Sequence, residues 1–246
     1  MKKIIAILLL SFICHFIFAN KFEVGKNMPF KSIKSALDKI ENGDTIYVHE
    51  GIYKEGNIIL SKTVNLIGVN FPILDGQKKY EILSIKAANT LVSGFRIQHS
   101  GFATLDDPCA IKVYDTRNVI ICNNILDDNF FGIYLQFSKN CIIKNNQIKA
   151  YGIEEQQIGN GIHCWKSDSL QVIANKVSGH RDGIYFEFVT NSVIWRNIST
   201  SNIRYGLHFM FSNNDSYISN VFKNNGAGVS VMFTHKVKMF NNTFTE

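Results

Sequence analysis

A repeat with a period in the low twenties is the feature that most constrains the fold of this 246-residue chain. Six segments begin with a small residue and continue into an apolar run. They are AIKVYDTRN from residue 110, GIYLQFSKN from 132, GIHCWKSDS from 161, GIYFEFVTN from 183, GLHFMFSNN from 206 and GVSVMFTHK from 228. Only the interval from 132 to 161 is clearly longer than the others, and it contains an insertion at residues 152–160. A fixed period in this range is typical of a solenoid.

An asparagine recurs with the same period. It lies at a nearly constant offset from each start, at Asn123, Asn145, Asn175, Asn197, Asn220 and Asn241. Since stacked coils place equivalent residues about 4.8 Å apart, we expect these amides to bond to one another in an internal ladder at a bend. The short apolar runs leave no room for helices between them. The sequence therefore predicts an all-β chain, a right-handed parallel β-helix of the pectate-lyase-like solenoid type.

The beginning of the chain fits the same architecture. Ile33, Ala36, Leu37 and Ile40 fall on one face of a short amphipathic helix. We expect this helix to cap the open end of the solenoid and to cover an exposed sheet edge. No linker, low-complexity tract or second domain is visible, so the β-helix domain is predicted to span residues 20–246.

Residues 1–19 have the pattern of a secretory signal peptide. A basic start, Lys2 and Lys3, is followed by an apolar run over residues 4–18 and by Ala19 at the expected cleavage position. The run is short for a membrane span. We therefore expect cleavage after Ala19 and a periplasmic protein.

Composition narrows the classes of partner. Apolar residues make up 46% of the chain and charged residues 19%, which indicates a folded chain rather than a disordered one. The net charge of +6 comes from scattered lysines and arginines. No basic run with interleaved aromatic residues occurs, which argues against nucleic acid as a partner.

The repeat assigns side chains to the two faces of each strand. Offsets 1, 3 and 5 from the starting glycine are predicted to point inward; in the last three coils they are Ile184, Phe186, Phe188, Leu207, Phe209, Phe211, Val229, Val231 and Phe233. Offsets 2 and 4 then form two outward columns. The first column contains Tyr134, His163, Tyr185, His208 and Ser230, and the second contains Gln136, Trp165, Glu187, Met210 and Met232. An exposed row of such large apolar and aromatic groups favours a binding surface.

Four residues of the outward columns are candidate metal ligands. His208 and Met210 lie on the same side of one strand, with Met232 and Glu187 expected on either side of Met210. Imidazole and thioether groups suit Cu(I), so the predicted site comprises His208, Met210, Met232 and Glu187. The alternative is that these side chains are ordinary surface, or are covered by a C-terminal segment or a partner chain. His180 and Asp182 are interpreted as bend residues beside this face, with a supporting or partner contact as the alternative.

Cysteine usage leaves the redox state open. Cys109, Cys122, Cys141 and Cys164 follow the signal peptide, and an exported chain can form disulfides. No two of them share a predicted column, which argues against a stacked disulfide. Cys122 is either free or paired with Cys109.

A carbohydrate-active enzyme is the main alternative function. Polysaccharide lyases and hydrolases need grouped acids. The densest acids are Asp106–Asp107 and Asp127–Asp128, which are predicted to lie in irregular segments between coils. Neither pair belongs to an outward column with a basic partner. Glu187 is the one carboxylate in the outward columns. The sequence therefore favours a protein without catalytic residues, and a solenoid that binds only other proteins is the third possibility.

Two stretches of the sequence resemble a known family. RDGIYFEFVTNSVIWRN, from residue 181, and RYGLHFMFSNNDSYISNVFKNNGAGVSVMFTHKVKMFNNTF, from residue 204, are similar to the NosD family. The resemblance implies a periplasmic β-helix that binds copper. It implies work with an ABC transporter, through its ATPase and membrane permease subunits, in assembling the copper-sulfide centre of the nitrous oxide reductase apo-enzyme. It also implies that copper is delivered rather than used in catalysis.

The family's motif positions carry over to Glu187, His208, Met210 and Met232. The chain departs from the family pattern in length. It stops at Glu246, immediately after a ladder asparagine and without a capping element. Family members continue with more coils, so we expect a chain truncated at its C-terminus.

Overall fold

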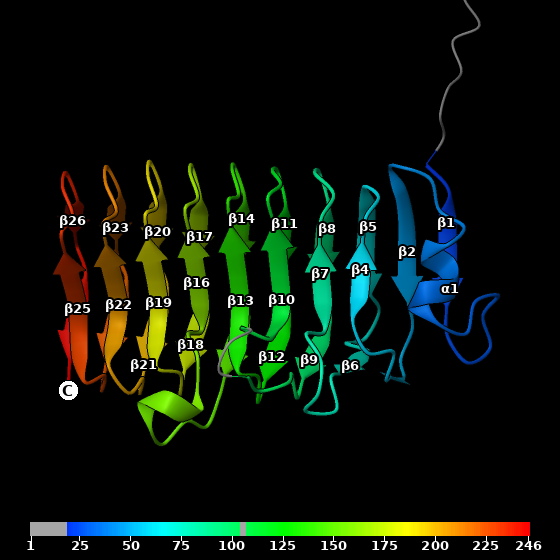
Figure 1. The fold of residues 1–246 in the computed structure, drawn as a ribbon, viewed down its shortest axis with the longest axis horizontal. Helices are drawn as coiled ribbons and strands as arrows, with labels where there is room; N and C mark the ends of the chain where they lie inside the picture. The colour runs from blue at the N-terminus through cyan, green and yellow to red at the C-terminus, as the bar shows by residue number, and fades with distance from the viewer. Residues whose placement is uncertain (1–18, 104–106) are drawn as a thin grey trace, which may run out of the picture.

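The structure, a computed structural model, describes residues 19–103 and 107–246. The predicted signal peptide therefore lies outside the described residues, apart from Ala19. In the described part the chain winds into coils that stack along one axis, and each regular coil contributes one strand to each of three sheets (Figure 1). All strand pairs are parallel, as the repeat predicts.

The first sheet has ten strands. They are β1 (Lys21–Val24), β2 (Asp44–Val48), β5 (Val64–Gly68), β8 (Leu91–Ser93), β11 (Ile120–Cys122), β14 (Ile142–Lys144), β17 (Gln171–Ile173), β20 (Val193–Trp195), β23 (Ser216–Ile218) and β26 (Lys238–Phe240). The second sheet has eight strands and carries the predicted outward columns. They are β4 (Ile58–Leu60), β7 (Leu83–Ile85), β10 (Cys109–Tyr114), β13 (Phe131–Gln136), β16 (Ile162–Trp165), β19 (Asp182–Glu187), β22 (Tyr205–Met210) and β25 (Ala227–Met232).

The third sheet has nine strands. They are β3 (Ile52–Tyr53), β6 (Ile73–Asp75), β9 (Arg96–Gln98), β12 (Ile125–Asp127), β15 (Gln147–Lys149), β18 (Lys176–Ser178), β21 (Ile198–Thr200), β24 (Val221–Lys223) and β27 (Thr243–Thr245). The described helices are α1 (Ile33–Leu37) and the 3-10 turn η1 (Glu155–Gln157). This arrangement confirms the all-β parallel β-helix predicted from the repeat.

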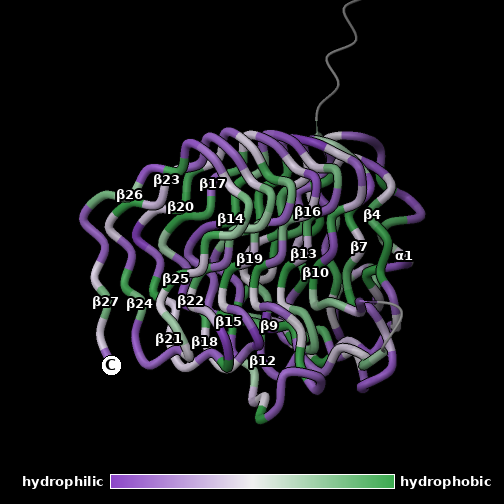
Figure 2. Tube along the Cα trace, turned by 60° about the vertical axis from the view of Figure 1, so that its left-hand side comes forward, coloured by the Kyte–Doolittle hydropathy of each residue, from purple (hydrophilic) through white to green (hydrophobic). Residues whose placement is uncertain are grey.

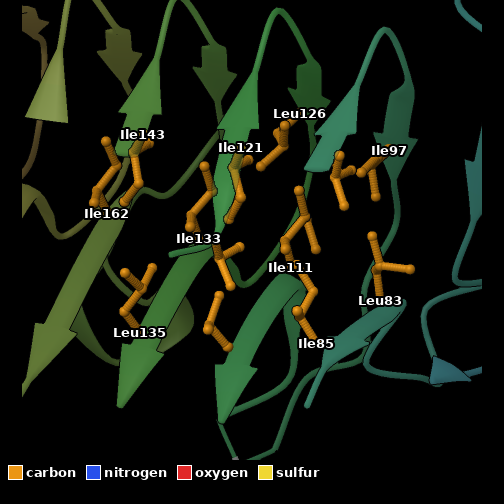
Figure 3. Packing of buried hydrophobic residues seen from close by; sticks show 14 of the residues in the cluster. Leu83, Ile85, Ile97, Ile111, Ile121, Leu126, Ile133, Leu135, Ile143 and Ile162 are labelled. Atoms are coloured by element: carbon orange, nitrogen blue, oxygen red, sulfur yellow. The ribbon is translucent and has the colours of Figure 1, made fainter. Parts of the chain in front are cut away.

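A continuous apolar core fills the inside of the coils. Polar and apolar stretches alternate along each coil, so that like residues of neighbouring coils lie side by side (Figure 2). Leucine and isoleucine side chains from different sheets meet inside the coil, among them Ile111, Ile121 and Leu126 (Figure 3). Each fully buried side chain of this size contributes about 1.5–3 kcal/mol relative to its exposed state.

The predicted capping helix is present as α1 at the N-terminal end of the stack (Figure 1). Ile33, Ala36 and Ile40 are completely buried against the first coils. The hydroxyl of Ser32 accepts a hydrogen bond from the backbone N–H of Ser35, and the carboxylate of Glu55 accepts from Ile33 and Lys34. These bonds satisfy N–H groups that a helix start leaves free.

The internal asparagine ladder exists, but half of its predicted members are wrong by one position. Its members are Asn124, Asn146, Asn175, Asn197, Asn220 and Asn242, at the same offset from each start. Asn123, Asn145 and Asn241 instead have φ between 50° and 56°. Asparagine tolerates this left-handed conformation better than most residues. It turns the chain there, and the following amide points inward.

The phenylalanines at offset 5 are a second correction. Phe188, Phe211 and Phe233 were predicted to be core residues but are exposed to 42%, 37% and 71%. Each follows the end of its strand with φ near 50°, which breaks the alternation of faces. Their rings stack on one another outside the coils, with centroids 5.0 and 5.1 Å apart. At offset 3, Phe186 and Phe209 are buried as predicted, but Val231 in the last described coil is 50% exposed.

The acidic pair at residues 127–128 also differs from its prediction. Asp127 belongs to strand β12 rather than to an irregular segment, and its carboxylate lies 2.8 Å from the guanidinium of Arg96. Asp128 lies 3.2 Å from Lys78. Both acids therefore have basic partners that are distant in the sequence. Of the other predicted pair, Asp106 lies outside the described residues.

The cysteines that the structure describes are Cys109, Cys122, Cys141 and Cys164. All four are free and buried. The alternative of a disulfide between Cys109 and Cys122 is therefore wrong. Burial raises the pKa of the Cys109 and Cys164 thiols well above the ordinary value, so both stay protonated.

Candidate functional site

The strand register confirms both outward columns. His163, Tyr185, His208 and Ser230 are neighbours across β16, β19, β22 and β25. In the same strands Trp165, Glu187, Met210 and Met232 are neighbours. Met210 therefore lies between Glu187 and Met232, as the repeat predicts.

The first column is buried, although it faces outward. Tyr134, His163, Tyr185 and His208, here called the imidazole–tyrosine stack, are exposed by only 4–8%. Successive ring centroids are 4.4, 4.8 and 4.5 Å apart, so each ring covers its neighbours. Stacked rings of this kind each add about 0.5–1.5 kcal/mol beyond burial. The expected exposed row is thus partly closed to solvent.

The insertion at residues 152–160 helps to close it. In Figure 1 this segment, which contains η1, projects from the body of the stack. The carboxylate of Glu155 in η1 lies 3.9 Å from the guanidinium of Arg204. Glu155 and Ile158 line a cleft of about 410 Å³ together with His163, Tyr185 and Glu187. The insertion that lengthens one repeat therefore forms one wall of a cleft beside the candidate ligands.

Asp182 and Arg204 hold the ring of His208. Arg204 donates two hydrogen bonds to the fully buried carboxylate of Asp182, at 2.9 and 2.6 Å. Nδ1 of His208 lies 3.3 Å from the same carboxylate. Burial alone would raise the pKa of Asp182, but the hydrogen bonds from His208 and Arg204 lower it below its ordinary value. Asp182 is therefore more than a bend residue.

This contact determines which nitrogen of His208 is free. An ionised carboxylate only accepts hydrogen bonds, so Nδ1 carries the proton. Nε2 is buried and has no hydrogen-bond partner among the described residues. A histidine that binds a metal through one nitrogen commonly donates the other N–H to a carboxylate. The geometry of His208 matches that arrangement.

The two methionines lie side by side on neighbouring strands. Met210 and Met232 are direct register partners, and both are partly buried. The hydroxyl of Tyr185 donates to Sδ of Met210 at 3.2 Å. Burial raises the pKa of Tyr185, so the phenol keeps its proton for this contact. Two thioethers and an imidazole thus share one patch of the sheet.

Glu187 lies beside Met210, but its carboxylate approaches His163. Oε2 of Glu187 is 3.8 Å from Nε2 of His163. Interaction with His163 lowers the pKa of Glu187, against the opposing effect of its burial. Burial lowers the pKa of His163 despite this neighbour. The structure therefore brings His208, Met210 and Met232 into one patch and pairs Glu187 with His163.

Neither Arg204 nor His163 was identified from the sequence as a supporting residue or a candidate ligand. Asp182 was interpreted as a bend residue, with a supporting or partner contact as the alternative. His163 was placed in the correct column, but the repeat carries no information on its partner. Asp182 and Arg204 are one coil period apart, and this spacing was the available signal. Within the described ranges, no three His, Cys, Asp or Glu side chains cluster closely enough to hold a metal ion.

Sequence comparison relates the chain to one family. Residues 151–246 match the family model described as periplasmic copper-binding protein (NosD). A relative from Pseudomonas aeruginosa, named probable ABC transporter binding protein NosD, is 27% identical over 130 residues. By these two matches the chain is similar to the NosD family over part of its length. The aligned segment spans 52% of this chain and 30% of the relative. The motifs at residues 181–244 lie within the region that the family model matches.

Solved structures resemble this NosD-like chain in fold alone. The periplasmic alginate epimerase AlgG, as a double mutant, gives a TM-score of 0.62 at 14% identity and covers 91% of this chain and 55% of its own. XylC in complex with xylose gives 0.60 at 10% identity, covering 90% and 69%. The catalytic domain of an α-1,3-glucanase with nigerose gives 0.54 at 14% identity, covering 91% and 45%. Among the described residues of this chain, none belongs to a helix with the length and apolar character needed to cross a bilayer.

Proposed function

We propose that this chain is a periplasmic copper-binding accessory protein rather than an enzyme. It works with the ATPase and membrane permease subunits of an ABC transporter in assembling the copper-sulfide centre of the nitrous oxide reductase apo-enzyme. The family description supports copper and the periplasm. The name of the Pseudomonas aeruginosa relative supports an ABC transporter partner. The role in reductase assembly rests on the resemblance of the motifs around Glu187, His208, Met210 and Met232.

One observation carries the copper proposal. Met210 and Met232 are register partners beside His208, whose Nδ1 is held by Asp182 and whose Nε2 has no partner among the described residues. Soft thioether ligands favour Cu(I), and imidazole also suits copper. Thioethers keep their ligating sulfur in an oxidising compartment, where a thiolate can be lost to a disulfide. In this proposal Glu187 completes the ligand set from the other side of Met210, and copper is the cargo.

Cu(I) titration against a competing chromophoric chelator tests the proposal. Met210→Leu combined with Met232→Leu keeps the volume and removes both sulfurs, so we expect Cu(I) affinity to fall by more than about tenfold. His208→Ala should weaken binding similarly. Met239→Leu is the matched control, because its side chain is 58% exposed and lies on another sheet, where its sulfur accepts from Tyr217. A double variant that binds Cu(I) as tightly as the unmodified chain would refute the site.

The carbohydrate-active alternative predicts a different result. A lyase would release unsaturated sugars from polyuronates, and a hydrolase would release reducing ends. Asp127 and Asp128 are engaged by Arg96 and Lys78. We therefore expect neither product, in an assay with the same purified protein.

A further inference from the structure

His163 has an unusual environment for a buried polar side chain. The residue is 7% exposed, and neither Nδ1 nor Nε2 has a hydrogen-bond partner among the described residues. Most buried polar side-chain atoms in proteins have at least one partner, so an imidazole with two unsatisfied nitrogens needs a reason. A neutral imidazole in this position keeps one lone pair available to a ligand.

The ring of His163 is held in place by its neighbours. Tyr134 stacks on it at a centroid distance of 4.4 Å and an interplanar angle of 3°. Tyr185 covers it from the adjacent strand at 4.8 Å, and Phe131 lies 5.7 Å away. These contacts fix the ring plane without using either nitrogen. A ligand that binds a nitrogen would therefore meet a pre-oriented group.

Glu187 supplies a second donor at a suitable distance. Its Oε2 lies 3.8 Å from Nε2 of His163, too far for a good hydrogen bond. Two donors that bind one ion at about 2.0–2.2 Å each are about 3.4 Å apart at a tetrahedral angle and about 4.2 Å apart when opposite. The observed separation falls within this interval, so one ion can contact both atoms.

An open cleft leads to this pair. The cleft of about 410 Å³ is lined by His163, Glu187 and Tyr185, by Glu155 of the insertion, and by Arg181. His163 is thus buried from bulk solvent but adjacent to a space large enough for an ion and its further ligands. Glu155 and Glu187 provide negative charge, which attracts a cation, and Arg181 opposes it in part.

We propose that His163 and Glu187 bind a divalent transition-metal ion, Zn²⁺ or Co²⁺, in the lining of this cleft. One imidazole and one carboxylate are ligands that suit these ions, in contrast to the thioether-rich set at Met210 and Met232. The remaining coordination positions open to the cleft and are filled by water or by a ligand from a partner. The site goes beyond the proposed Cu(I) function: it shares Glu187 with that ligand set but needs neither thioether, and His163 belongs to this site alone.

Titration with Co²⁺ under aerobic conditions, followed by its visible d–d absorption, tests the site. Cu²⁺ electron paramagnetic resonance adds a direct readout, because one bound imidazole nitrogen gives a superhyperfine pattern. We expect one Co²⁺ per chain, displaced by Zn²⁺. His163→Phe retains a stacking ring but no nitrogen, so affinity should fall by more than about 100-fold and the nitrogen pattern should disappear.

Two further variants make the result decisive. Glu187→Gln, at a partly exposed position, should weaken Co²⁺ binding even if His163→Phe folds poorly. The combined Met210→Leu and Met232→Leu variant should bind Co²⁺ unchanged, because this site uses neither thioether. Absence of Co²⁺ and Cu²⁺ binding to the unmodified chain overturns the proposal, as does unchanged binding by folded His163→Phe. A chain that binds Co²⁺ but not Cu(I) would overturn the proposed function and leave this site standing.

Discussion

At the scale of single residues, buried polar atoms without partners concentrate in a few side chains. His163, His180 and His208 each keep at least one such ring nitrogen among the described residues, and all three lie in the coils of the candidate site. Burial lowers the pKa of His180 to about 4, so it stays neutral at physiological pH. A neutral imidazole is the form that can bind a metal.

Asp215 presents the opposite case, a buried acid. Oδ1 accepts a hydrogen bond from the backbone N–H of Ser192 at 2.8 Å, but Oδ2 has no partner among the described residues. Burial raises the pKa of Asp215 to about 7. Because the folded-state pKa exceeds the unfolded value, this group contributes stability below about pH 4 that is lost as the pH rises through about 7.

We predict that Asp215→Asn stabilises the protein at pH 8 and not at pH 4. The amide resembles the protonated acid, so the variant avoids an ionisation cost of up to about 4 kcal/mol. Urea unfolding of both proteins at the two pH values measures the difference, since other groups titrate alike in both. An equal difference at pH 4 and pH 8 would contradict the assignment.

At the scale of elements, each corner of a coil combines a left-handed turn residue with an inward amide. At the corner between β14 and β15, Asn145 has φ of 56° and Asn146 is buried. Oδ1 of Asn146 accepts from the backbone N–H and the side chain of Asn124, and its Nδ2 donates to Ile121 and Asn175. Asn145 therefore forms the turn, and Asn146 bonds the bend to the neighbouring coils.

These two positions give a matched test. Asn146→Ala leaves buried backbone groups of Asn124 and Ile121 without partners, which should cost about 2–4 kcal/mol in the free energy of unfolding. Asn145→Gly keeps the left-handed turn and removes only an exposed side chain, so we expect a change below about 1 kcal/mol. Chemical denaturation measures both. Similar losses in the two variants would show that the ladder is not the stabilising element.

At the scale of the whole molecule, the stability of each coil depends on the coils on either side of it. Each coil buries its inner face only against its neighbours, so the interfaces between coils determine how strongly each is held. At the N-terminal end α1 covers the first coils, and Ile46 and Val48 of β2 are completely buried. In the last described coil, Val231, Met239 and Phe244 are 47–58% exposed.

Hydrogen exchange should reveal this gradient. We expect amides of β25, β26 and β27 to exchange at least about tenfold faster than those of β13 and β19, because fewer apolar contacts oppose local opening. The amides of β2 should be as protected as the middle coils. Mass spectrometry of peptides from each coil measures the rates, and uniform protection along the stack would contradict the expectation.

The sequence by itself determined the coil architecture, the capping helix and the outward columns. A period kept over six segments leaves few ways to bury the apolar runs, so fold and register follow from spacing alone. The sequence could not show which asparagine of each Asn-Asn pair belongs to the ladder. It also could not show that the phenylalanine after each strand lies outside the core. In both cases a residue with left-handed backbone reverses the alternation of faces. The NosD resemblance came from local motifs and needed no structure.

Only the tertiary structure decided how the candidate site is held. The partners of His208 and Glu187 come from different coils and depend on side-chain directions that the spacing does not specify. Asp182 and Arg204 meet beside His208 because parallel stacking brings residues one coil apart together. The insertion at residues 152–160 folds next to them and forms one wall of the cleft beside His163. Physical proximity across coils, rather than residue type, determines which of these groups can share a ligand.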